Sequence, residues 1–138
     1  IGHLVSKGGM AAVKAYYEKL GTEFVNALNE MLVFDAVICN VDRHFGNFGV
    51  MVDHRTNTIV SHALLFDNGN SLFNFASVYD DFLGTAKAAM TPELREELRH
   101  LLNLKFKKHS GYNLPENRLR MVERQVQKRA RALLDIRM

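Results

Sequence analysis

The chain has 138 residues, of which 47% are hydrophobic and 24% are charged, a balance typical of one soluble globular domain. No uncharged apolar run approaches the roughly 18 residues that a membrane span needs. A single cysteine, Cys39, excludes an internal disulfide. We therefore expect a cytoplasmic domain with no membrane span.

The charge is unevenly distributed along the chain. Residues 1–104 contain 8 basic and 12 acidic side chains, whereas residues 105–138 contain 10 basic and 3 acidic ones. A basic C-terminal segment can face solvent, an acidic partner or nucleic acid. Nucleic-acid binding stays open as an alternative, but a solvated helix face is the favoured interpretation.

Hydrophobic periodicity predicts two helices before residue 40. Residues 10–20 carry apolar side chains at helical spacing, and Gly21 provides a stop. Thr22 is expected to cap a second helix that runs through the apolar segment 31–39. Because this helix is apolar on most sides, we expect it to be buried.

The rest of the chain predicts one hairpin and two further helices. The β-prone segment 48–52, a polar turn and the apolar segment 58–66 are typical of a hairpin. Residues 70–90 lack periodicity and are expected to form a loop. Thr91 and Pro92 favour a helix start, and a last helix is expected to start at Asn113. The sequence therefore predicts a mainly α fold with a small β-hairpin.

The most specific pattern spans residues 34–73, FDAVICNVDRHFGNFGVMVDHRTNTIVSHALLFDNGNSLF. It places D-x-H-x-x-N at positions 42–47, directly after the buried helix, and D-N-G at positions 67–69, after the hairpin. Each acid or amide alone is typical of an ordinary turn. Their joint spacing favours a site for phosphate transfer.

Phosphoryl transfer needs an aligned hydroxyl and a neutralised triphosphate. Asp42, in a loop held by the buried helix, is a candidate base that orients and deprotonates the hydroxyl. The side-chain oxygens of Asn47 and Asp67 suit magnesium, which prefers oxygen ligands. His44 is expected to orient Asp42 or to contact phosphate, and a hydrogen-bonded, orienting histidine is favoured.

The same residues resemble the catalytic core of the HipA-like kinase group, which are bacterial serine/threonine protein kinases with a protein-kinase-like fold. The resemblance implies that Asp42 is the catalytic base and that Asn47 and Asp67 hold magnesium. It implies ATP and Mg as cofactors and a protein Ser/Thr hydroxyl as acceptor. Asn68 stands where many kinases have phenylalanine, so the chain lacks the residue of their phenylalanine-driven switch. Similar motifs occur in phosphatidylinositol kinases, which leaves lipid headgroups as alternative acceptors.

Kinases of this class also need an upper lobe with a strand lysine that pairs with the nucleotide phosphates. The residues before Asp42 predict helices instead, and the chain begins at Ile1, which suggests a fragment. We therefore expect residues 1–138 to form a C-terminal kinase lobe alone, with the N-terminal lobe supplied in cis or in trans. Such a lobe is expected to transfer phosphate weakly or not at all. A pseudokinase scaffold and a nucleic-acid or partner-binding module are the alternatives.

Overall fold

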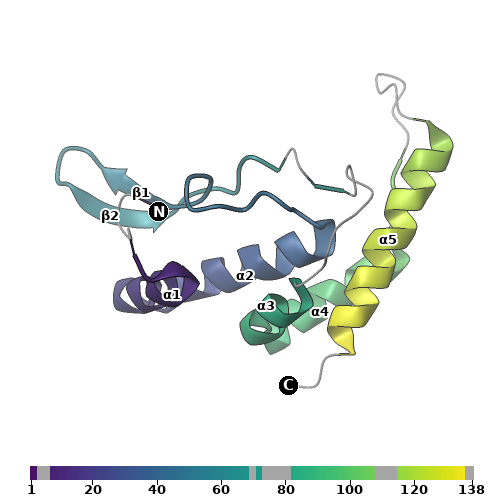
Figure 1. Ribbon diagram of the computed structural model, residues 1–138, viewed down its shortest axis with the longest axis horizontal. Coiled ribbons are helices and arrows are strands. Elements are labelled where there is room, and N and C mark those ends of the chain that lie inside the picture. The colour runs from purple at the N-terminus through teal and green to yellow at the C-terminus, as the bar shows by residue number, and fades with distance from the viewer. Residues whose placement is uncertain (3–6, 69–70, 73–81, 108–114, 136–138) are drawn as a thin grey trace.

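The computed structural model describes residues 1–2, 7–68, 71–72, 82–107 and 115–135. Within these ranges the chain is mainly helical and has one two-stranded antiparallel sheet (Figure 1). In chain order the elements are α1 (Gly9–Leu20), α2 (Thr22–Ile38), β1 (Val50–Asp53), β2 (Thr58–His62), α3 (Phe82–Ala89), α4 (Pro92–His100), the 3-10 helix η1 (Leu101–Asn103) and α5 (Glu116–Leu134). The expectation of a mainly α fold with a small hairpin is therefore confirmed.

Helix α2 is the centre of the fold. It packs against α1, α3, α5 and β2, and its C-terminal half is buried almost continuously. Gly21 separates α1 from α2 with a φ of 123°, a conformation that favours glycine, and its N–H donates to the carbonyl of Tyr17. The expected burial of the second helix is confirmed, but Gly21 rather than Thr22 occupies its N-cap position.

The hairpin pairs Val50 with His62 and Asp53 with Thr58, with a register shift between Met51 and Val52. Its second strand ends at His62, so only the first part of the expected segment 58–66 is a strand. The residues that follow run as irregular chain back along α2 toward its C-terminal end (Figure 1). The hairpin thus returns Asp67 and Asn68 to the end of the helix that precedes Asp42.

Helices α3 and α5, from the C-terminal half of the chain, also pack against α2. The hydroxyl of Thr91 accepts from the backbone N–H of Leu94, which confirms the expected cap of α4. Helix α5 buries an apolar stripe, as its spacing predicts. It begins at Glu116, and the expected start at Asn113 lies outside the described residues.

Helix α3 contradicts the expectation of a continuous loop over residues 70–90. It packs on α2 through Ala86 and Ala89, which are buried. Alanines let two helices approach closely but give a weak periodic signal, and this explains why the sequence pattern missed the helix. Among the helices in the described ranges, none combines the length and apolarity needed to cross a bilayer.

Candidate functional site

The loop that carries Asp42 is fixed to the end of α2. Cys39 adopts a left-handed conformation with φ 54°, which turns the chain away from the helix axis. The N–H of Asn40 still donates to the carbonyl of Asp35 at 3.0 Å. The side chain of Asn40 is fully buried, and its Oδ1 accepts from the N–H of Asp42 at 3.1 Å. The half-buried Asp42 therefore has a backbone position set by the buried helix.

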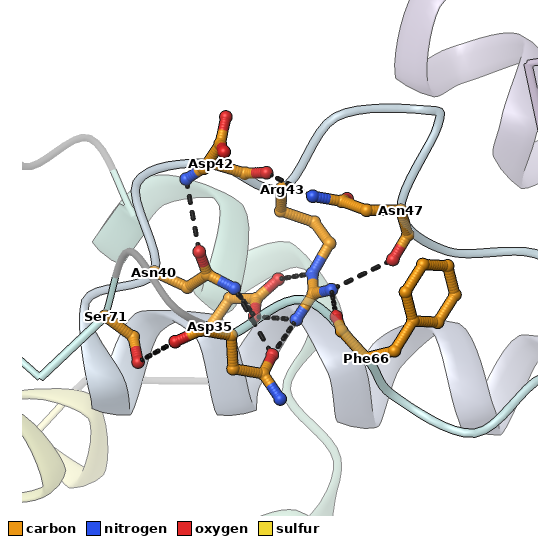
Figure 2. Close-up of polar contacts among 8 residues, drawn as sticks. Asp35, Asn40, Asp42, Arg43, Asn47, Phe66 and Ser71 are labelled. Carbon is orange, nitrogen blue, oxygen red and sulfur yellow. Dashed lines mark hydrogen bonds and ion pairs between the residues drawn. The ribbon is translucent and has the colours of Figure 1, made fainter.

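Asn47 is buried at the far end of the same loop. Its N–H donates to the carbonyl of His44 at 3.1 Å, and its Nδ2 donates to the carbonyl of Asp42 at 2.5 Å (Figure 2). Because a carbonyl is only an acceptor, the amide nitrogen must face it, which fixes the position of Oδ1. That oxygen is buried and has no hydrogen-bond partner among the described residues. A buried acceptor without a partner is rare in folded proteins, and a hard cation would satisfy it.

An ion pair between Arg43 and Asp35 lies beneath the loop. Nε and Nη2 of Arg43 bond the two carboxylate oxygens of Asp35, each at 2.8 Å, and the two side chains are only 5% and 4% exposed. Nη1 donates to the carbonyls of Asn47 (3.1 Å) and Phe66 (2.8 Å), and Nη2 donates to Oδ1 of Asn68 (2.7 Å). These contacts use every N–H that a guanidinium has.

The same contacts hold the segment that carries Asp67. Its two neighbours, Phe66 and Asn68, both bond Arg43, and the hydroxyl of Ser71 donates to the carbonyl of Asn68 at 2.5 Å (Figure 2). Asp67 itself has a φ of 55°, a left-handed conformation that few non-glycine residues adopt. It is exposed, so ligands can reach it from solvent.

The structure therefore brings the two halves of the sequence pattern to one place. Asp42 and Asn47 are joined by a hydrogen bond. The carbonyls of Asn47 and of Phe66, the residue before Asp67, both accept from Nη1 of Arg43. Gly69, the last residue of the D-N-G motif, lies outside the described residues.

His44 is exposed and is held within its own loop. Its Nδ1 accepts from the N–H of Gly46 at 3.0 Å. A Cβ at Gly46 would lie 2.9 Å from Cε1 of the ring, so a glycine is needed there for the ring to approach this closely. The histidine is thus hydrogen-bonded, while its role toward Asp42 stays a prediction.

The donor set suits magnesium shared with phosphate better than a metal held by protein alone. In the part of the chain that the structure describes, no three His, Cys, Asp or Glu side chains gather to hold a metal ion. Magnesium on a nucleotide usually takes one or two protein oxygens, and phosphate and water supply the others. The orphaned oxygen of Asn47 fits this requirement, and the exposed Asp67, whose neighbour Phe66 shares a nitrogen of Arg43 with Asn47, is the candidate carboxylate.

Sequence reasoning missed the residues that assemble this site. Neither Asp35, which interrupts the apolar segment 31–39, nor Arg43, which stands inside D-x-H-x-x-N, is among the predicted site residues. A signal was present, because a carboxylate on a helix that is apolar all round needs a partner. The basic side chain nearest in the sequence is Arg43, which flanks the candidate base.

Two arginines of helix α5 bond backbone carbonyls of other segments of the chain. Arg118 donates to the carbonyl of Leu72 at 3.0 Å, and Arg129 donates to that of Ala36 in α2 at 2.5 Å. The exposed cations of the helix are Arg124, Lys128 and Arg131. Two arginines of the basic segment therefore hold the chain near the site, and three of its other cations are exposed to solvent.

No protein-family model, curated protein or solved structure matches the chain. A function is therefore inferred from the chemistry of the site. That site combines an acid on an anchored backbone, an orphaned amide oxygen and a second, accessible carboxylate on a constrained turn.

Proposed function

We propose that the protein is the C-terminal catalytic lobe of an ATP- and magnesium-dependent kinase of the HipA-like serine/threonine type. The observation that carries the proposal is the buried Oδ1 of Asn47, which has no hydrogen-bond partner among the described residues. Its amide nitrogen is committed to the carbonyl of Asp42, so the oxygen is presented in one fixed orientation beside the candidate base.

In the proposed reaction a serine or threonine hydroxyl of a protein attacks the γ-phosphorus of ATP. The bond from that phosphorus to the β–γ bridging oxygen breaks, ADP leaves, and the hydroxyl proton passes to the carboxylate of Asp42. Asn47 and Asp67 would hold magnesium, which when bound neutralises charge on the phosphates. His44 would support the loop that positions Asp42.

Two features of the residues support this division of roles. Asp42 is half-buried with its backbone anchored, which suits a group that must align a hydroxyl. Asp67 is exposed, which suits a ligand that meets a metal–nucleotide complex arriving from solvent. A lipid hydroxyl fits the same chemistry and is the alternative acceptor.

Binding of a metal–nucleotide complex tests the proposal directly. The protein is titrated with ATP in the presence and absence of Mg²⁺, and binding is followed by calorimetry and thermal shift. We expect Mg²⁺ to strengthen ATP binding, and Asp67→Asn to remove this effect. Asp53→Asn makes the same charge change in the hairpin and is the matched control, because Asp53 lies in β1.

Three outcomes separate the hypotheses. Mg²⁺-dependent ATP binding with transfer of labelled γ-phosphate supports an active kinase lobe. The same binding without transfer, also after an N-terminal lobe is added, supports a pseudokinase scaffold. ATP binding that ignores Mg²⁺, or an Asp67→Asn variant that behaves like Asp53→Asn, would refute the proposed site.

A nucleic-acid or partner-binding module is the second candidate, favoured only by three cations on one face of α5. Arg124, Lys128 and Arg131 are exposed and spaced by four and three residues. Binding to phosphate backbones weakens steeply with salt. A titration with DNA and RNA at two salt concentrations tests this candidate, and absence of binding at the lower one removes it.

A further inference from the structure

Arg43 contacts the backbone or side chain of residues on both sides of Asp67. Nη1 bonds the carbonyl of Phe66 and Nη2 bonds Oδ1 of Asn68 (Figure 2). Nη1 also bonds the carbonyl of Asn47. One guanidinium therefore connects Asn47 with both neighbours of Asp67, although these segments lie far apart in the sequence.

The turn at Asp67 needs such support. A left-handed conformation at a non-glycine residue is unfavourable and persists where its surroundings impose it. The neighbours of Asp67 supply two fixed points through Arg43, and Ser71 supplies a third through the carbonyl of Asn68. The conformation of Asp67 is thus imposed through the hydrogen bonds of its two neighbours.

The chemistry of the contact requires an arginine. Its planar fork binds both oxygens of Asp35 and still directs three N–H groups at three other acceptors. A lysine at this position has three donors on one nitrogen and cannot reproduce that arrangement. Asp35 balances the charge, so the fork can be buried beneath the loop.

We propose that Arg43 is the positioning residue of the metal site, which sets Asp67 relative to Asn47. This inference rests on the proposed function. Asn68 contributes to this positioning. Many kinases carry a phenylalanine at its place, whereas here the amide oxygen of Asn68 accepts from Arg43 and so links the turn to the buried ion pair. The geometry of the turn therefore depends on polar contacts with Arg43.

The test is the Mg²⁺ dependence of ATP binding in Arg43→Lys. We expect the Mg²⁺ concentration for half-maximal effect to rise roughly 10-fold or more, as is typical when a residue that supports metal ligands is changed. Binding of ATP without metal should stay within about twofold of the wild type, because the side chain of Arg43 is only 5% exposed and is not available to a nucleotide. Arg55→Lys, at an exposed arginine in the hairpin turn, is the control and should change neither value.

A double-mutant comparison makes the assignment specific. In an Asp67→Asn background Arg43→Lys should have no further effect on the Mg²⁺ response, because the ligand that it positions is already lost. An unchanged Mg²⁺ response in Arg43→Lys, or an equal loss of metal-free ATP binding, would overturn the positioning role alone. A wild-type protein without any Mg²⁺ response would refute the proposed function, and the positioning role with it.

Discussion

Replacing Arg43 alone should destabilise the fold more than replacing Arg43 and Asp35 together. Arg43→Met leaves the carboxylate of Asp35 in a site where it is only 4% exposed, with no cation to balance it. Removing one member of a buried pair typically costs about 3–5 kcal/mol, whereas replacing both members with apolar side chains is often neutral. The pair is too buried for solvent screening to reduce these values.

The magnitude can be refined from the other contacts of the guanidinium. Arg43→Met also leaves the carbonyls of Asn47 and Phe66 and the amide oxygen of Asn68 without this donor. The bond to Phe66 is exposed, so water can replace it, and Nδ2 of Asn40 still donates to Oδ1 of Asn68, so these acceptors add little to the cost. We therefore expect the single variant to lose about 5 kcal/mol, and the Asp35→Leu/Arg43→Met double variant to recover at least about 2 kcal/mol of this loss.

The assay is urea unfolding of the wild type, both single variants and the double variant, followed by circular dichroism. In a thermal scan of the same variants, a loss of about 5 kcal/mol corresponds to a fall in Tm of about 10–20 °C for a chain of 138 residues. Arg55→Met provides the control for losing an exposed arginine. Additive effects of the two single changes, or a cost for Arg43→Met below about 1 kcal/mol, would show that the pair is not a coupled, buried unit.

Three further predictions concern the surroundings of the site. Asn40→Ala removes the acceptor for the N–H of Asp42 and should cost about 1–3 kcal/mol in urea unfolding, and Asn40→Asp should cost at least as much, because it places a buried carboxylate against that of Asp35. Gly46→Ala should displace the ring of His44, which an NMR shift of the ring protons would report, with little change in stability because the ring is exposed. Burial lowers the pKa of His62, so the unfolded chain binds more protons in acid. The free energy of unfolding should therefore fall as the pH drops below about 6.5, and a His62→Phe variant whose pH profile matches that of the wild type would contradict this.

The parts of the fold that could be predicted from the sequence are those with strong local signals. The apolar run 31–39 predicted a buried helix because no exposed helix can be apolar on most sides. Two β-prone segments around a polar turn predicted the hairpin, and the cap at Thr91 located the start of α4. The sequence also places the second half of the motif after this hairpin, and the structure links it to Asn47 through Arg43.

The parts that could not be predicted depend on contacts between distant segments. Helix α3 is buried through alanines, whose periodic signal is weak, so the sequence did not predict that this helix packs against α2. The roles of Asp35 and Arg43 depend on which acceptors surround one guanidinium, and three of these acceptors are contributed by the segments that end at Asn47 and begin at Phe66. Composition and periodicity carry no information about such a convergence.

The last turn of α2 explains why the two halves of the motif meet. Asn40, directly after the helix, holds the N–H of Asp42, and Asp35 within it holds Arg43 and through it the turn at residues 66–68. The carbonyl of Ile38 accepts from the N–H of Leu72 at 2.7 Å, which fixes the chain beyond that turn. Because a single rigid helix end supplies all three anchors, a change that shifts this turn should move both halves of the site together.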